Sequence, residues 1–218
     1  MLKIFAIDTS TPRVVTCYSD EDKKILIELE TKAKHGVQVS QIADMMKDVD
    51  FNNLDVVGIG IGPGSLTGLR VGIAFATGIG IGKRFVQVNS LKLIAHNLEF
   101  FNGYTIVLRK AREGYLYGAV YKSGNGKIEE IEKPFIDDVE SIRKKIEKYT
   151  PKLCIGDGAE FFECRLNGKN FNLPSSRNLL RLVEEQIEKE SFVEIVEPLY
   201  LQKSIAELNF EKRQKELK

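Results

Sequence analysis

One stretch of the sequence, residues 56–84, most constrains the fold, because it combines a buried strand, a tight turn and a helix edged with glycine. It opens with a short uncharged run rich in valine and isoleucine, which is typical of a strand covered on both faces. A Gly-Pro-Gly turn follows at residues 62–64, since proline fixes φ and glycine tolerates backbone conformations closed to other residues. The sequence then predicts a helix, for which Ser65 and Thr67 are candidate N-caps.

Small residues recur at every fourth position of this stretch, namely Gly64, Gly68, Gly72, Ala76 and Gly80. Positions four apart lie along one side of a helix, so these residues form an edge almost without side chains. Glycine inside a helix lowers its stability by roughly 0.5–1 kcal/mol relative to alanine. Close approach of another backbone is the usual gain that offsets this loss. Two interpretations stay open: the edge packs on the chain's own sheet, or it also contacts a second chain. A membrane span is excluded, because only 12 uncharged residues separate Arg70 from Lys83, against the roughly 20 that a bilayer requires.

The composition is that of a soluble globular protein without the basic excess of one that binds nucleic acid by itself. Of the 218 residues, 43% are hydrophobic and 29% charged, and the formal net charge is +1. A protein that binds nucleic acid unaided usually carries a basic excess. Cys17, Cys154 and Cys164 are odd in number and form no CxxC pair, and the first residues lack signal-peptide architecture. We therefore expect a cytoplasmic protein whose thiols are small buried packing residues.

The order of the expected elements predicts two weakly similar α/β lobes. Periodicity places strands at residues 2–7, 14–18, 25–29, 56–61, 85–88, 105–108, 115–121, 128–131 and 153–155. It places further helices at residues 35–49, 90–97, 138–149 and 176–189, with Ser90 as a candidate cap. We predict an N-terminal lobe at residues 1–100 and a C-terminal lobe at 101–218, which ends in a charged tail from residue 203.

Two acidic loops are candidates for a nucleotide site. They comprise Asp8, Ser10 and Thr11 after the first strand, and Gly156, Asp157 and Gly158 after a strand of the second lobe. Ligands of open α/β sheets lie outside the carboxyl ends of the strands. A carboxylate there can hold a metal-bound water, and hydroxyls or glycine amides can donate to phosphate. Both segments also fit plain turns, an Asx turn in the first loop and a Gly-Asp-Gly turn in the second.

Independent catalysis has little support in the sequence. His35 begins a helix that has Gln38 and Val39 one turn on, so a surface or capping histidine is favoured over a metal ligand. Residues 110–113 offer charge without a nucleophile–base pair. No nucleophile, orienting base and oxyanion site come together, and no metal site is expected.

Five motifs spread along nearly the whole chain match one known family. They are Ile-Asp-Thr-Ser-Thr at residues 7–11, Gly-Ile-Gly-Pro-Gly-Ser-Leu-Thr-Gly-Leu-Arg-Val-Gly at 60–72, Ala-Arg-Glu-Gly-Tyr-Leu-Tyr at 111–117, Gly-Asp-Gly-Ala at 156–159 and Pro-Leu-Tyr-Leu at 198–201. The second motif is the most specific. On these residues the chain resembles the TsaB (YeaZ) family. The resemblance implies a two-lobed ribonuclease H-like, actin-like ATPase fold of the acetate and sugar kinase/Hsc70/actin superfamily.

The resemblance also implies a noncatalytic scaffold that supports formation of N6-threonylcarbamoyladenosine beside the anticodon of tRNAs reading codons that start with A. In that system TsaC makes threonylcarbamoyl-adenylate, TsaD transfers the carbamoyl group to tRNA, and TsaE is an ATPase. The implied partners are TsaD, TsaE and a second copy of the chain, with tRNA reached only through the complex and no membrane. The chain is expected to hold no cofactor of its own, and ATP or ADP only within the TsaD/TsaE complex.

The family packs its glycine-edged helix and the preceding helix on TsaD or on a second copy. The resemblance therefore implies a partner interface at Gly64, Gly68, Leu69, Gly72, Ala76, Gly80, Val39, Ile42 and Met46. We expect Gly72→Leu to leave the monomer folded and to abolish association. TsaD keeps a His-x3-His metal pair, whereas His35 stands alone here with Val39. Lys110 stands where the family usually has Asp, so no role is carried over to its loop.

Two other functions stay open as alternatives. A small ATP-dependent, kinase-like enzyme of the same fold would need Asp8 and Asp157 to hold a magnesium nucleotide. A metal-dependent peptidase is an older assignment for this branch of the superfamily, and the sequence lacks ligands for it.

Overall fold

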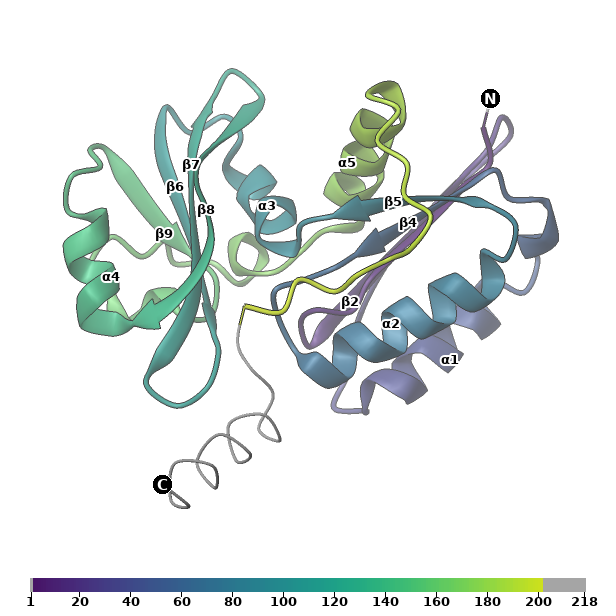
Figure 1. Ribbon diagram of the computed structural model, residues 1–218, viewed down its shortest axis with the longest axis horizontal. Coiled ribbons are helices and arrows are strands. Elements are labelled where there is room, and N and C mark those ends of the chain that lie inside the picture. Colours follow the sequence, from purple (N-terminus) through teal and green to yellow (C-terminus); the bar gives the residue numbers. More distant parts are fainter. Residues whose placement is uncertain (1, 202–218) are drawn as a thin grey trace, which may run out of the picture.

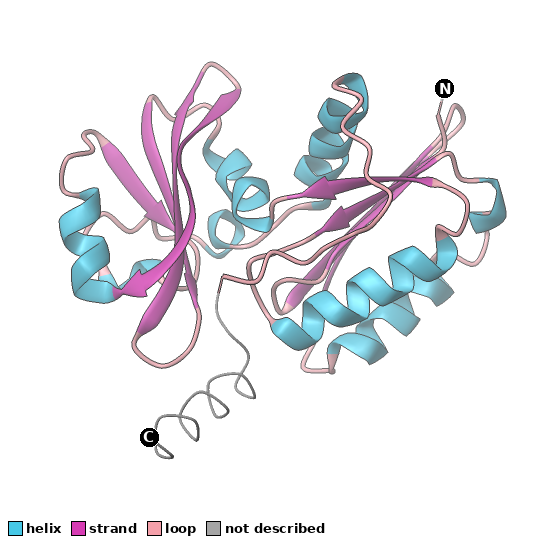
Figure 2. Ribbon diagram, viewed as in Figure 1, coloured by secondary structure: helices cyan, strands magenta, loops and turns pink. Residues whose placement is uncertain are grey.

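The computed structural model describes residues 2–201, which form two lobes, each built on one β-sheet (Figure 1). The first sheet has five strands in the order β3-β2-β1-β4-β5, and the second has four in the order β8-β7-β6-β9. Figure 2 shows helices on both faces of the first sheet and beside the second. The predicted charged tail lies outside the described residues.

The elements follow the predicted order closely. The strands are β1 (Ile4–Asp8), β2 (Arg13–Ser19), β3 (Lys24–Glu30), β4 (Val56–Gly60), β5 (Arg84–Val88), β6 (Gly103–Lys110), β7 (Tyr115–Gly124), β8 (Lys127–Asp138) and β9 (Lys152–Ile155). The α-helices are α1 (His35–Met45), α2 (Leu66–Ile79), α3 (Ser90–Ala95), α4 (Val139–Ile146) and α5 (Ser176–Glu188). Short 3-10 turns are η1 (Phe51–Asn53), η2 (His96–Leu98), η3 (Ala159–Phe161) and η4 (Lys169–Asn172).

The first sheet carries a separate core on each face. β1 pairs antiparallel with β2 and parallel with β4, so it lies at the centre of the sheet. Because successive side chains of a strand point to opposite faces, Phe5 and Ile7 pack with α1 and α2. Ile4 and Ala6 pack with α5 on the other face. In Figure 1, α1 and α2 lie side by side beneath the sheet, and α5 lies above it.

The second sheet is also covered on two faces. Ile106 and Leu108 of β6 pack with α4, whereas Val107 between them packs with α3. β8 is longer than the strand predicted at residues 128–131 and runs through Pro134. Proline is tolerated there because β8 is an edge strand, where one side of the backbone has no ladder partner.

Helix α5 connects the two parts of the chain in a way that the sequence did not indicate. It belongs to the range predicted as the C-terminal lobe, yet its apolar face packs on the first sheet through Leu179, Leu182 and Val183. The chain then continues along the same lobe, where the amide of Val193 donates to the carbonyl of Phe85 at 2.9 Å. The predicted lobe boundary at residue 100 therefore separates the two sheets, but α5, which follows this boundary in the sequence, packs on the first sheet.

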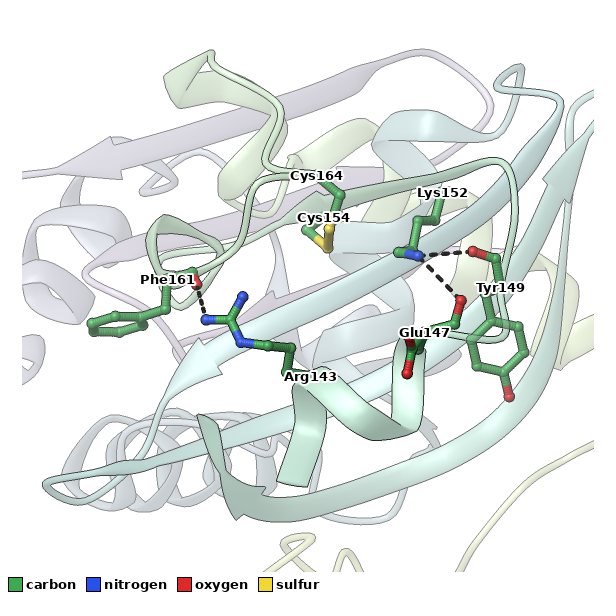
Figure 3. Close-up of a disulfide and its surroundings, with 7 residues drawn as sticks. All are labelled: Arg143, Glu147, Tyr149, Lys152, Cys154, Phe161 and Cys164. Carbon is green, nitrogen blue, oxygen red and sulfur yellow. Dashed lines mark hydrogen bonds between the residues drawn. A yellow bond between two sulfur atoms is a disulfide. The ribbon is translucent and has the colours of Figure 1, made fainter. Parts of the chain in front are cut away.

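The cysteines differ from the prediction of three free thiols. Cys17 is buried and unpaired, as expected of a packing residue. Cys154 of β9 and Cys164 form a disulfide across a sequence separation of 10 (Figure 3). The chain segment after η3 returns alongside β9 and brings the two Cα atoms to 5.2 Å, within the range of natural disulfides.

No helix within residues 2–201 is long and apolar enough to cross a membrane.

Candidate functional site

The Gly-Pro-Gly turn fixes the start of α2 against the end of β1. Ser65 is the N-cap, and its Oγ accepts a hydrogen bond from the amide of Gly68 at 3.2 Å. The Ser65 amide donates to the carbonyl of Ser10 at 2.9 Å and so joins the turn to the β1–β2 loop. Gly62 has a φ of +94°, a left-handed conformation that favours glycine. Of the two predicted caps, Ser65 is used, and Thr67 lies exposed in the helix.

The glycine edge of α2 is filled by the β1–β2 loop of the same chain. A Cβ on Gly64 would overlap Ser10. A Cβ on either Gly68 or Gly72 would overlap Thr9. Thr9 also donates its hydroxyl to the carbonyl of Gly68 at 2.7 Å. From Gly64 to Gly72 this edge therefore packs within the chain itself, against the β1–β2 loop.

Most of the residues assigned to a partner interface are buried within the chain itself. Buried side chains or backbones are found at Gly68, Leu69, Gly72, Ala76, Gly80, Val39, Ile42 and Met46, and Gly64 is half-buried. Their spacing of three and four residues is that of a helix face packed on the first sheet. Such a face shows this spacing whether or not a partner exists. The expectation for Gly72→Leu changes accordingly, because a leucine there would collide with Thr9 inside the monomer.

The outer face of α1 and α2 points away from the sheet (Figure 1). We define it by the exposed residues Val37, Ser40, Gln41, Asp44 and Met45 of α1 and Thr67, Arg70, Ala74 and Gly78 of α2. Val37 and Met45 are large apolar side chains with exposed fractions of 51% and 57%. Ala74 and Gly78 are four residues apart, so α2 presents its backbone with little side-chain cover. A second helix can approach such a surface closely.

His35, at the first position of α1, ties that helix to the β1–β2 loop. Its Nε2 lies 3.0 Å from the carbonyl oxygen of Thr11, so this nitrogen carries the proton and donates. The ring also packs beside the position that a Cβ on Gly68 would take. His35 thus braces the loop and faces no second ligand of a metal pair.

The carboxylate of Asp8 is buried and fully used inside the first lobe. Its Oδ1 accepts hydrogen bonds from the amide and the hydroxyl of Ser10, at 2.9 and 2.7 Å. Its Oδ2 accepts a hydrogen bond from the hydroxyl of Ser90. The hydroxyl of Thr11 donates to the carbonyl of Arg13 at 2.6 Å. The predicted phosphate donors therefore point into the protein. Ser90, a predicted cap, donates its hydroxyl to Asp8 instead, and the neighbouring Asn89 caps α3.

The second acidic loop is more open. Oδ1 of Asp157 accepts hydrogen bonds from Nε of Arg109 and from the amide of Lys110, both at 2.9 Å. The Asp157 side chain is 41% exposed. It borders a cavity of about 250 Å³, which Gly156 and Glu160 also line. Lys110 forms an ion pair with Glu160 at 2.7 Å, and this carboxylate raises the pKa of the lysine.

The two acidic loops therefore differ in what they offer a ligand. Asp8, Ser10 and Thr11 have no exposed surface, whereas the Asp157 side chain is 41% exposed and lines the cavity. In the described part of the chain, no three His, Cys, Asp or Glu side chains are grouped so that they could hold a metal ion. The geometry thus provides one closed loop, one shallow polar cavity and a broad exposed helical face.

Comparison with known proteins identifies the family. The profile described as TsaD, tRNA N6-adenosine threonylcarbamoyltransferase, matches residues 30–174. The chain belongs to the TsaD family. Among curated proteins it is similar to the tRNA threonylcarbamoyladenosine biosynthesis protein TsaB of Bacillus subtilis, at 29% identity over 137 residues that span 60% of this chain and 59% of that protein. It is also similar to TsaB of Escherichia coli, at 26% identity over 227 positions that span 94% of this chain and 96% of that protein.

Solved structures give the same result for the fold. YeaZ from Pseudomonas aeruginosa superposes with a TM-score of 0.76 at 20% identity, covering 92% of this chain and all of that one. A P. aeruginosa protein described as uncharacterized, with similarity to peptidase YEAZ, superposes with a TM-score of 0.78 at 20% identity and covers 93% of this chain. The predicted resemblance to TsaB (YeaZ) is confirmed, and the chain has the two-lobed α/β fold of the YeaZ structures.

No local pattern in the sequence indicates the contacts that hold the two lobes of this TsaD-family chain together. Nδ2 of Asn97 donates to the carbonyls of Asn170, Phe171 and Leu173, at 3.2, 3.1 and 2.8 Å. Oδ1 of Asn97 accepts from Nδ2 of Asn178 at 2.8 Å. One amide side chain thus holds η4 beside η2 and the start of α5. Asparagine in a polar loop is ordinary in composition, so only the structure reveals this role.

Proposed function

We propose that the chain is a noncatalytic scaffold in tRNA threonylcarbamoyladenosine biosynthesis that binds TsaD through the outer face of α1 and α2. The curated relatives named TsaB are biosynthesis proteins of this modification, and the family profile is that of TsaD itself. The single observation that carries the proposed surface is the contrast between a filled glycine edge and an exposed outer face on the same helix pair.

The noncatalytic part of the proposal is supported by the state of the first acidic loop. An enzyme that transfers phosphate on this fold needs a carboxylate and donors that can reach a magnesium nucleotide. Here Ser10 and Ser90 donate to the two oxygens of the buried Asp8, and the loop itself packs against the glycine edge of α2. Opening that loop would leave a buried carboxylate and several hydroxyl groups without partners.

The binding part of the proposal is supported by the chemistry of the outer face. It combines two exposed apolar side chains, Val37 and Met45, with the small residues Ala74 and Gly78. Arg70 and Asp44 add one charge of each sign at its margin. Interfaces of this kind have an apolar centre with a polar rim. The same face serves TsaD and, in the absence of TsaD, a second copy of the chain.

The remaining partners follow from this arrangement. TsaE joins the complex through TsaD, and the chain acts in the cytoplasm without a cofactor of its own. A net charge of +1 gives little electrostatic attraction to tRNA, so tRNA is bound by the complex as a whole.

Substitution of one exposed serine by arginine tests the proposed surface. Ser40 lies on the outer face, and Ser191 is equally exposed after α5, beyond the opposite face of the sheet. We expect Ser40→Arg to weaken binding to the cognate TsaD by about tenfold or more, because a long charged side chain prevents close helix approach. Binding is measured by titration calorimetry, and stoichiometry by light scattering coupled to size-exclusion chromatography.

The matched variant Ser191→Arg is expected to bind as the unmodified chain does. Circular dichroism verifies that both variants are folded. Equal weakening by the two variants, or no weakening by Ser40→Arg, would place the TsaD surface elsewhere. A chain that does not bind TsaD at all would refute the scaffold function.

A kinase-like enzyme is the second candidate, because the Asp157 side chain is 41% exposed and borders a polar cavity. Such an enzyme would bind magnesium-ATP as an isolated chain at micromolar to low millimolar Kd. Titration calorimetry with magnesium-ATP on the chain and on the variant Asp157→Asn tests this. Saturable binding that the variant loses would support the kinase-like enzyme. Absence of binding heat would favour the scaffold function.

A further inference from the structure

The Cys154–Cys164 disulfide closes the loop that carries the second acidic site. Cys154 lies in β9, the edge strand of the second sheet. The amide of Cys154 donates to the carbonyl of Cys164 at 2.7 Å, and the amide of Leu166 donates to the carbonyl of Cys154 at 2.8 Å. The chain from Gly156 to Glu163 therefore leaves β9 and returns beside it, with the disulfide joining its two ends (Figure 3).

The enclosed loop is held at its near end by hydrogen bonds to β6 and η4. Gly158 donates its amide to the carbonyl of Leu108 at 3.0 Å. The amide of Gly156 donates to Oδ1 of Asn172 at 2.8 Å. Asp157 accepts from Arg109 in β6. The far end of the loop, after η3, is held by the disulfide and the two backbone bonds beside β9. It is also held by Arg143, which donates to the carbonyl of Phe161 at 3.1 Å, and by the buried ring of Phe162.

The two sulfur-bearing residues differ in access. Cys154 has no exposed surface, whereas Cys164 is half-buried. Cys164 lines a cavity of about 420 Å³ whose wall carries charges of both signs, from Arg143, Lys144 and Lys152 and from Glu140, Glu147 and Glu163. Lys152 donates to the backbone carbonyls of Glu147 and Tyr149 (Figure 3). A small thiol can therefore approach one sulfur of the pair through this cavity and is kept from the other.

We propose that Cys154–Cys164 is a thiol-exchange site for small thiols such as glutathione, and that its opening and closing changes the mobility of the Asp157 loop. The thiolate of glutathione attacks Sγ of Cys164, the disulfide bond breaks, and Sγ of Cys154 leaves as a thiolate that takes a proton. A second glutathione thiolate attacks the glutathione sulfur of this mixed disulfide and releases the thiol of Cys164 and oxidised glutathione. Two electrons pass from two glutathione molecules to the pair, and oxidised glutathione reverses both steps.

Opening the disulfide removes the covalent link at the far end of the Asp157 loop, while the hydrogen bonds at both ends remain. Removing a cross-link restores conformational freedom to the segment that it closed. The effect is confined to the second lobe, because α1 and α2 pack on the first sheet. The inference therefore stands or falls without TsaD, and its test does not depend on the proposed function.

The test compares the oxidised full-length chain with the same chain in millimolar reduced glutathione at native conditions. Thiols are trapped by alkylation at successive times and mapped by peptide mass spectrometry. We expect an intermediate with glutathione on Cys164, followed by free thiols at both positions. Hydrogen exchange of residues 156–163 should then rise by about tenfold or more, with that of α1 unchanged.

Three outcomes would overturn the inference. The disulfide could resist native glutathione overnight while the denatured chain is reduced, which would make it a structural staple. Glutathione could appear on Cys154 rather than Cys164. The loop could exchange equally fast in the oxidised and reduced chains, which would mean that the disulfide does not control it.

Two variants serve as controls. Cys17→Ser removes the third thiol, whose buried position raises its pKa and keeps it unreactive, so it should change neither rate nor exchange. The double variant Cys154→Ser/Cys164→Ser should show the fast loop exchange in either buffer. If the double variant fails to fold, the comparison of the oxidised and reduced natural chain still decides the question.

Discussion

Gly72 and Gly78 lie on different edges of the same helix, α2, and their surroundings are opposite. A Cβ on Gly72 would overlap Thr9, whereas a Cβ on Gly78 would meet no atom within 4 Å. The first glycine is required by the chain's own packing, and the second is not. The difference shows that a glycine pattern along a helix indicates close packing on one edge of that helix. It does not indicate whether any molecule packs against the other edge.

This contrast also separates two roles within the helix pair. The inner edge of α2 anchors the β1–β2 loop, which in turn encloses Asp8. The outer face meets nothing within the described residues that would require its small side chains. Glycine at position 78 lowers the stability of the helix relative to alanine, and no contact among the described residues offsets this cost.

Leucine at the inner edge is expected to have the largest effect. Gly72→Leu forces a side chain into space that Thr9 occupies, so either α2 or the β1–β2 loop must move. Overpacking of this kind costs about 3 kcal/mol, which lowers the Tm of a domain of this size by roughly 6–12 °C. Thermal unfolding followed by circular dichroism measures the shift. The control is Gly78→Leu, and an equal loss of stability in both would remove the contrast between the two edges.

The sequence predicted the order of elements and the two-lobed fold, because the strands and helices have clear hydrophobic periods. It also located the tight turn and the cap at Ser65, where residue chemistry permits few alternatives. It could not choose what fills the glycine edge. Spacing fixes the edge, but the neighbour is a loop 59 residues away in the chain, as the bond from Thr9 to Gly68 shows.

Three other features depended on long-range packing that no local pattern specifies. The apolar face of α5 fits either sheet, and only the assembled lobes place it on the first. Cys154 and Cys164 have no recognisable spacing, and they meet because the chain returns along an edge strand. Ser90 was a reasonable helix cap, yet its hydroxyl reaches Asp8 across 82 residues of sequence.

A smaller effect is expected from Thr9→Val, which keeps the shape of the side chain and removes its hydroxyl. Thr9 is buried and donates to the carbonyl of Gly68 at 2.7 Å. Loss of one such hydrogen bond costs about 1 kcal/mol. Denaturant unfolding at constant m-value measures it. A neutral result would mean that shape alone holds the loop in the groove, and the role of the inner edge would reduce to steric fit.

The smallest effect, and the one of opposite sign, is expected at the outer edge. Gly78→Ala adds a methyl group into open space within α2, so nothing needs to move. Alanine restricts the unfolded chain more than glycine does and favours the helix, which predicts a gain of about 0.5 kcal/mol. Denaturant unfolding of the isolated chain measures this gain. A loss of stability instead would show that the outer edge is filled in solution by another part of the chain or by a second copy. Repeating the measurement over a range of protein concentrations distinguishes these two cases, since only association with a second copy depends on concentration.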